Sequence, residues 1–326
     1  MPGKTLIVGA GLAGTLTAWE MYKRGEDFSV YDNGNPSASL VAAGIFNPVS
    51  FKRVVEVWNA EEHMKVMLET YIEIEDELGV KFLNKLPIIR IFPNEQYRDH
   101  WKSRLESGHE VAKWISPIQN EVPEGVVAPF GFGLVKNAGW VNLPKMIEGI
   151  KSKFPDRFDQ NSWKISDGIP EKFDRVIDCR GVGAKKELNN LGYKLASDHG
   201  EVLTLKSTNF AQQDYTINKI KWLMPFQKNL FKLGATYTWG LEESKPTVEG
   251  KIELLETIKP ALKPSISENF EVVNHESGLR PTSHDRRPYV GELENNSGIF
   301  ILNGLGTRGV LVAPLMVKKL VDQIFN

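Results

Sequence analysis

Residues 5–14 read Thr5-Leu6-Ile7-Val8-Gly9-Ala10-Gly11-Leu12-Ala13-Gly14, and this stretch decides the fold. The residues before Gly9 are apolar or β-branched, which is typical of a strand buried on both faces. A glycine loop follows at once, and the apolar spacing after it predicts a helix that ends at Gly25. Phe28–Asp32 has the composition of a second buried strand. The first 32 residues therefore predict a strand–helix–strand unit.

The glycine spacing inside this unit matches the dinucleotide-binding fingerprint. Gly9 permits the tight turn, Gly11 lets the backbone approach a pyrophosphate, and Gly14 lets the helix pack closely on the strand. Asp32 ends the second strand and can accept hydrogen bonds from a ribose diol. An ordinary turn with a surface aspartate is the alternative, and it leaves the combined spacing unexplained. We therefore expect a bound dinucleotide, which the motif alone does not identify as NAD or FAD.

A second glycine loop lies near the end of the chain. Gly298–Asn303 is predicted to be a strand, Gly304–Gly309 a loop, and Val310–Phe325 a helix with Pro314 in its first turn or so, where proline is tolerated. A helix N-terminus without bulky side chains suits an electron-rich group such as the pyrimidine edge of a flavin. Close packing of the last helix explains the loop equally well.

Composition and charge bound the remaining possibilities. A chain of 326 residues exceeds the usual size of a single core, so two domains are expected. The formal net charge of −1 gives no support to nucleic-acid binding. The single Cys179 excludes a disulfide framework, and the ungrouped histidines predict no metal site. We find no targeting signal and no apolar run long enough to span a bilayer, so a cytoplasmic enzyme is expected.

The order of predicted elements indicates two discontinuous domains. An amphipathic helix is predicted over 60–78, and another over Leu143–Lys153 with Asn142 or its neighbour as its N-cap. In the stretches 81–136 and 201–274, short apolar runs alternate with turn residues, which is typical of strands and loops. We therefore assign 1–80, 137–200 and 275–326 to a nucleotide-binding domain, and 81–136 with 201–274 to a substrate-binding domain.

These motifs together resemble the FAD-dependent D-amino acid oxidase superfamily, which includes glycine oxidase and sarcosine oxidase. The likeness rests on the first glycine loop with Asp32, on residues 37–44, on 174–181, and on Gly278-Leu279-Arg280-Pro281. The run from Gly304 to Leu315 is similar to the oxidase domain of the bifunctional enzyme that completes methylaminomethyl-thiouridine in tRNA. The resemblance implies an α/β fold: a three-layer, Rossmann-like FAD-binding domain with an inserted, mainly antiparallel β-sheet substrate domain.

The resemblance also implies site residues. In the family, the arginine placed like Arg280 often binds the substrate carboxylate, and Arg308 lies inside the flavin loop, so both are expected to be catalytic. FAD is expected to bind without a covalent bond, because Cys179 lies in an apolar strand where a free cysteine usually packs as a small hydrophobe. The residues expected to contact FAD are Gly9, Gly11, Leu12, Ala13, Gly14, Asp32, Ser37, Ser39, Ala43, Gly44, Gly181, Gly304, Gly306, Thr307, Arg308, Gly309 and Val310.

The expected activity is oxidation of the carbon–nitrogen bond of a carboxylated amine, such as a D-amino acid, glycine or an N-substituted glycine. Hydride would pass to flavin N5, and Arg280 would hold the carboxylate through two parallel hydrogen bonds. The electron acceptor, oxygen or a quinone, is left open. Two alternatives remain: a tRNA-modifying oxidase acting on an N-linked glycine unit of a nucleobase, and a flavin-binding protein without turnover.

Overall fold

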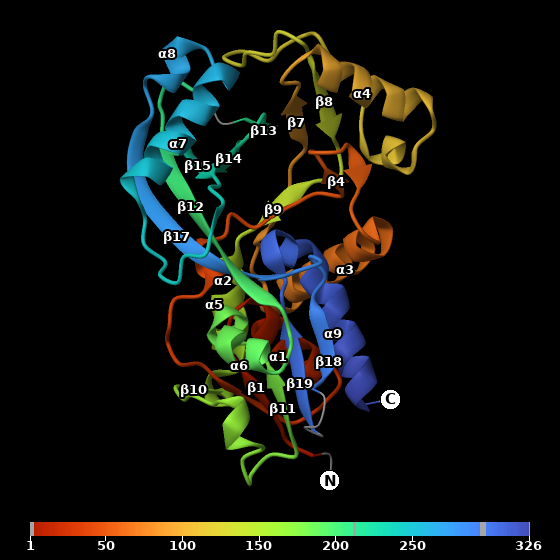
Figure 1. Cartoon of the computed structure of the whole chain (residues 1–326), viewed down its shortest axis with the longest axis vertical. Helices are drawn as coiled ribbons and strands as arrows, with labels where there is room; N and C mark the ends of the chain where they lie inside the picture. The colour runs from red at the N-terminus through yellow and green to blue at the C-terminus, as the bar shows by residue number, and fades with distance from the viewer. Residues whose placement is uncertain (1–2, 211–212, 294–297, 326) are drawn as a thin grey trace.

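The computed structural model describes residues 3–210, 213–293 and 298–325, and it consists of two halves (Figure 1). The lower half in Figure 1 holds both ends of the chain and an α/β sheet. The upper half is built on a second sheet with helices α4, α7 and α8 around it. None of the helices in the described ranges has the length and apolar composition that crossing a bilayer requires.

The first sheet has six strands, and the glycine loop leaves it at the end of β1 (Thr5–Val8). The first five strands run parallel, and the sixth is antiparallel to the fifth. In spatial order they are β10 (Phe158–Asp159), β2 (Phe28–Tyr31), β1, β11 (Arg175–Asp178), β19 (Ile299–Asn303) and β18 (Tyr289–Glu292). The predicted strand–helix–strand unit is confirmed, with α1 (Leu12–Lys23) as its helix.

Four helices pack into the core on one face of this sheet. They are α1, α3 (Ala60–Leu78), α5 (Leu143–Lys153) and α9 (Gly309–Phe325). The bounds of α3 and α5 match the prediction, and the Asn142 side chain accepts a hydrogen bond from the Lys145 N–H at 3.2 Å as the N-cap of α5. The opposite face is covered by Trp163, Phe173 and α6 (Lys185–Asn190).

The second sheet is mainly antiparallel, as the family resemblance implies. Only the pair of β7 and β13 is parallel among its described strand pairs. In order its strands are β16 (Thr238–Trp239), β12 (Leu195–Lys206), β15 (Leu230–Gly234), β14 (Trp222–Gln227), β13 (Thr216–Asn218), β7 (Ile88–Ile91) and β8 (Phe132–Val135), with β17 (Glu271–Ser283) also paired to β12.

Strands β12 and β17 belong to both halves. They pair from Leu195 opposite Ser283 to Lys206 opposite Glu271. Leu195 packs into the core beside the first sheet, whereas Leu205 packs into the core of the second. The boundaries that we assign at 200/201 and 274/275 fall inside these strands, and the division into domains stays a prediction.

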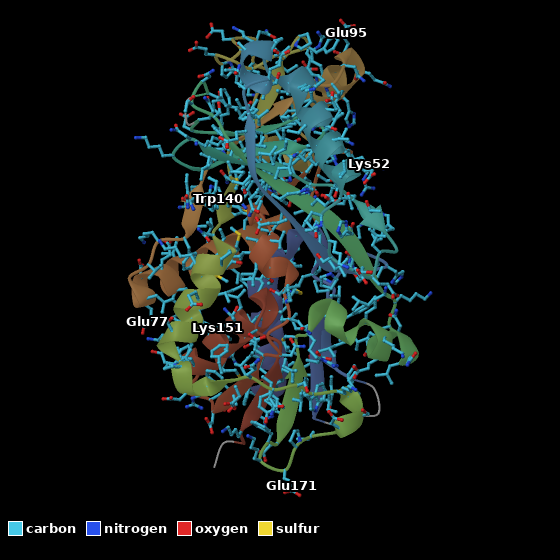
Figure 2. All side chains as sticks on the ribbon, turned by 90° about the vertical axis from the view of Figure 1, so that its left-hand side faces the viewer. Lys52, Glu77, Glu95, Trp140, Lys151 and Glu171 are labelled. Carbon is cyan, nitrogen blue, oxygen red and sulfur yellow. The ribbon has the colours of Figure 1, made fainter. Side chains whose placement is uncertain are left out.

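Short elements connect the two sheets. Two small strand groups and the one-turn helix α2 (Ala38–Val41) lie at the junction, where Figure 2 shows Trp140 above the α/β half. The small strands are β3 (Ile45–Phe46), β9 (Gly139–Val141) and β6 (Leu83–Lys85) in one group, and β4 (Val49–Ser50) and β5 (Val55–Glu56) in the other.

The prediction of strands and loops alone for the second domain is wrong in three places. The structure has α4 (Glu95–Glu106) in the first stretch, and α7 (Val248–Ile258) and α8 (Pro264–Ser267) in the second. Helix α4 is mostly polar and buries only Trp101, so its apolar periodicity is weak. Its N-cap signal is present nonetheless, because the Asn94 side chain accepts from the Tyr97 N–H at 2.8 Å.

The position expected for Pro314 also needs correction. Helix α9 begins at Gly309, so Pro314 lies beyond the first turn and cannot donate a hydrogen bond to the Val310 carbonyl. The buried Tyr71 hydroxyl of α3 donates to that carbonyl instead, at 2.8 Å. A side chain from another helix thus replaces the missing backbone donor.

Candidate active site

A cavity of about 550 Å³ lies at the carboxyl ends of β1, β2, β11 and β19. That volume is within the range of small-molecule and cofactor sites, and this edge of a parallel sheet is where such ligands bind. The cavity continues to the second sheet, where Gly200, Val202, Trp222 and Tyr237 form its wall. It therefore joins the dinucleotide loop to the half that we expect to bind substrate.

Most of the predicted site residues meet in this one cavity. Those that line it are Gly9, Gly11, Leu12, Ala13, Asp32, Ser37, Ser39, Ala43, Gly44, Gly181, Gly306, Thr307, Gly309, Val310 and Arg280. Gly14, Gly304 and Arg308 are not among its lining residues. A side chain at Gly14 would overlap the Gly9 carbonyl oxygen, so Gly14 serves the packing of α1 on β1.

The start of α1 forms a cradle for the first part of the ligand. Gly9 has a φ of +101°, a conformation that favours glycine. The Leu12 N–H points at the Ser39 hydroxyl, 3.0 Å away. A Cβ atom at Gly11 would approach that hydroxyl to 3.3 Å, so the absence of a side chain keeps the helix N-terminus open. These features fit the pyrophosphate of a dinucleotide.

Asp32 is paired with a lysine that the motif does not include. The Lys151 Nζ lies 2.7 Å from Asp32 Oδ2, and both side chains line the cavity. Figure 2 labels Lys151 on α5. The Gly34 N–H donates to Asp32 Oδ1 at 3.2 Å. Lysine in the last turn of a helix is common, so no sequence signal distinguishes Lys151.

The second glycine loop lies at the other end of the cavity. Leu305 of this loop pairs with Thr282 in an isolated antiparallel bridge, and the buried hydroxyl of Thr282 has no hydrogen-bond partner among the described residues. A Cβ atom at Gly306 would lie 3.7 Å from that hydroxyl oxygen. Gly306 and Gly309 line the cavity here without side chains, which leaves room for the pyrimidine edge of a flavin.

Arg280 lies where the cavity meets the second sheet. Its side chain crosses Gly200, where any side chain would overlap the guanidinium. The guanidinium is 4.8 Å from the centre of the Tyr237 ring, and its Nη1 lies 3.5 Å from Asp198 Oδ2. Burial raises the pKa of Asp198, and Arg280 opposes that rise. The contact with Asp198 is long and single, so Arg280 keeps donors for a ligand.

Cys179 contributes to packing. Its thiol lies 4.0 Å from the Thr17 hydroxyl inside α1, and burial raises its pKa. A thiol held in its neutral form is a poor nucleophile, which speaks against a covalent flavin bond.

The comparison with protein families decides what binds here. The family model for DAO, described as FAD dependent oxidoreductase, matches residues 4–323. The chain belongs to the DAO family of FAD-dependent oxidoreductases. Its cofactor is therefore FAD, for whose pyrophosphate the cradle at Gly11 is a suitable site.

Individual relatives are distant. The chain is 21% identical to glycine oxidase of Pseudomonas putida over 99% of its own length and 94% of that protein. It is 22% identical to the tRNA 5-methylaminomethyl-2-thiouridine biosynthesis bifunctional protein MnmC of Marinobacter nauticus, over 98% of this chain. It spans only 55% of that bifunctional relative. Glycine oxidase of Geobacillus kaustophilus has the same fold, with a TM-score of 0.82 and 19% identity over 99% of this chain and 95% of that one.

Proposed function

We propose that this DAO-family enzyme oxidises the carbon–nitrogen bond of an amine that carries a carboxylate. The observation that carries the proposal is Arg280, which lines the cavity with a side chain only 17% exposed. Asp198 is the one carboxylate within 4 Å of its guanidinium in the described part of the chain. A planar guanidinium with free donors is suited to bidentate binding of a carboxylate. The glycine oxidases among its relatives are consistent with such a substrate.

The residues of the chain would position both ligands. The loop from Gly9 to Gly14 would hold the pyrophosphate of FAD, Asp32 the ribose diol, and the loop from Gly304 to Gly309 the flavin end. FAD supplies the two-electron acceptor when it is bound. Arg280 would fix the carboxylate end of the substrate, so that the amine and its neighbouring C–H group take a defined orientation.

Aromatic side chains would close the site from water. Trp222 and Tyr237 line the cavity beside Ala235 and form an apolar wall near Arg280.

Oxygen or a quinone would reoxidise the flavin. The single, buried Cys179 suits a reducing compartment, so we place the enzyme in the cytoplasm.

An anaerobic screen tests this proposal directly. The holoenzyme is mixed with glycine, N-methylglycine and D-amino acids, and reduction is followed as loss of the flavin absorbance. We expect reduction by at least one of these carboxylated amines and none by the matching amines that lack the carboxylate. Equal reduction by both sets would contradict the role of a carboxylate site.

The variant Arg280→Met tests the residue itself. Removing one partner of a desolvated charge pair costs about 2–5 kcal/mol, which corresponds to a loss of roughly thirty- to several-thousand-fold in substrate affinity or efficiency. We expect FAD content to stay close to that of the wild type and Tm to fall only modestly, because the contact that Asp198 loses is long and single. Arg280→Lys should recover only part of the loss, because lysine keeps the charge without the bidentate fork. A variant whose only defect is loss of FAD would assign Arg280 a structural role.

A second candidate is favoured by the similarity to the MnmC proteins over 98% of this chain. In this alternative the carboxylated amine is an N-linked glycine unit on a nucleobase of tRNA. Binding of tRNA would then weaken steeply as salt concentration rises. Measuring tRNA affinity at 50 mM and 200 mM salt, in parallel with the screen of small amines, separates the two candidates.

A further inference from the structure

Two glycines face each other on the strand pair that carries Arg280. Gly200 of β12 lies directly opposite Gly278 of β17, and both line the cavity. Arg280 lies two residues further along β17, opposite Asp198. Residues two apart on a strand point to the same face of a sheet, so Arg280 shares its face with both glycines. The glycine pair therefore leaves bare backbone beside an arginine of the cavity wall.

The end of the Arg280 side chain occupies the space above Gly200. A Cβ atom at Gly200 would overlap Cζ and both Nη atoms of Arg280. The two residues are diagonal neighbours across the strand pair, a separation that a long side chain can span. Gly278 differs, because a Cβ atom there would lie at least 3.4 Å from its nearest neighbours, Ala38 and Val41. Of the two glycines, only Gly200 is needed for the position of Arg280.

The position over Gly200 leaves one side of the guanidinium free for a ligand. Nη1 donates to the Thr236 carbonyl oxygen at 3.4 Å and lies 3.5 Å from Asp198 Oδ2. In the part of the chain that the structure describes, Nε and Nη2 have no hydrogen-bond partner. These two nitrogens form one edge of the planar group and can donate two parallel hydrogen bonds to a carboxylate.

We propose that Gly200 is a positioning residue of the carboxylate site. Because it has no side chain, Arg280 lies across β12 with its Nε–Nη2 edge available to the cavity. Residue 200 thereby determines how strongly the site prefers a carboxylate over a neutral group. This inference rests on the proposed function and adds a residue that acts through Arg280.

An alanine at position 200 should displace Arg280 and leave the fold intact. The atoms that it would overlap are at the flexible end of a side chain, so the guanidinium can move aside without a shift of the backbone. Gly200 is not among the glycines with positive φ, so its backbone conformation is open to alanine. The expected defect is therefore loss of carboxylate binding with FAD retained.

Binding of acetate and acetamide tests the inference without turnover. Each probe is titrated into the oxidised holoenzyme, and its Kd is read from the change in flavin absorbance. We expect Gly200→Ala to raise the Kd of acetate at least tenfold and to leave the Kd of acetamide unchanged, because acetamide has a similar shape and no charge. Gly278→Ala is the matched control, since it adds the same methyl group to the same face of the strand pair. It should change neither Kd.

A double-mutant cycle with Arg280→Ala separates positioning from a general structural effect. In the Arg280→Ala background, Gly200→Ala should cause no further loss of acetate affinity, because the group that it displaces is absent. The same four proteins are compared by Tm, which keeps the test valid where Gly200→Ala is too unstable for titration. Any decrease in Tm caused by Gly200→Ala should be smaller without the Arg280 side chain.

Three results would overturn the inference. The first is wild-type affinity for acetate in Gly200→Ala, in a series where Arg280→Ala loses it. The second is an equal loss in Gly278→Ala. The third is an effect of Gly200→Ala on acetate affinity or Tm that is the same with and without the Arg280 side chain. Failure of the proposed function looks different: either the wild type binds no acetate, or Arg280→Ala binds it as tightly as the wild type.

Discussion

Two glycines of the first loop differ in function although they lie three residues apart. Gly11 faces the cavity and leaves room at the helix N-terminus, whereas Gly14 faces the Gly9 carbonyl inside the fold. The cavity therefore tolerates a larger residue 11 only when it is empty of ligand. At position 14 a larger residue is excluded with or without a ligand, because its side chain would overlap the Gly9 carbonyl oxygen.

Gly11→Val and Gly14→Val should separate these two roles. We expect Gly11→Val to fold and to lose FAD, because its backbone is extended, at φ −78°, and its side chain would fill the cradle. Gly14→Val should instead lower Tm or prevent folding, because no neighbouring backbone can move aside. Circular dichroism and flavin content of the purified variants check both outcomes. A Gly11→Val protein with full FAD occupancy contradicts the first.

His63 is a residue whose protonation opposes folding. It is fully buried, neither ring nitrogen has a hydrogen-bond partner in the described ranges, and burial lowers its pKa to about 4. Its ordinary value is about 6.5, so the unfolded chain binds more protons between these two pH values. Stability contributed by neutral His63 is therefore present above about pH 6.5 and is lost as pH falls toward 4.

The expected slope from this one group is at most about 1.4 kcal/mol per pH unit. Urea denaturation at pH 7 and pH 5 should show a smaller loss of stability in His63→Gln than in the wild type. His284→Gln is the matched control, because His284 is exposed, and it should behave as the wild type does. If the free energy of unfolding of His63→Gln depended on pH as it does in the wild type, His63 would not be a cause of that dependence.

At this scale the sequence identifies residues that act within a contiguous motif. The position of Gly9, Gly11 and Asp32 at the cavity was predictable, because it follows from local spacing. Lys151 was not, because it meets Asp32 across 119 residues of chain.

Among the secondary-structure elements, α9 depends most clearly on a neighbour. Pro314 interrupts its backbone hydrogen bonding, and Tyr71 of α3 supplies the missing donor to Val310.

The long helices were predictable because their apolar stripes are regular. Helix α4 was not, because a polar helix that buries one tryptophan leaves almost no periodic signal.

A double-mutant cycle tests the support of α9. Tyr71→Phe leaves the Val310 carbonyl buried without a donor, which should lower the free energy of unfolding by about 1–3 kcal/mol. Pro314→Ala restores a backbone N–H in α9, so Tyr71→Phe should cost less in that background. Urea denaturation of the four proteins gives the coupling. Strictly additive effects would show that the hydroxyl and the proline act independently.

For the molecule as a whole, the cavity makes stability depend on the cofactor. Its walls come from both halves, so a bound ligand connects them. At a free FAD concentration one hundred times Kd, binding stabilises the folded state by about 2.7 kcal/mol. We expect the Tm of the apoprotein to rise by several degrees with added FAD and to rise less with FMN, which lacks the adenosine half that we propose for the site at Gly11 and Asp32. Equal increases in Tm with FAD and FMN would contradict our proposal that the cavity at Gly11 and Asp32 binds the adenosine half of FAD.

The ladder of β12 and β17 has a consequence for how such a protein changes over evolutionary time. Because β12 packs into two cores and pairs with β17 along its length, a recombination event that exchanged the upper half as a block would have to cut both strands and restore their register. We therefore expect relatives to retain the ladder and to differ more in the strands and turns attached to it. New specificities should arise by point substitution and loop insertion around β14, β16 and α7, and Arg280, carried on the ladder itself, should be passed on with the scaffold.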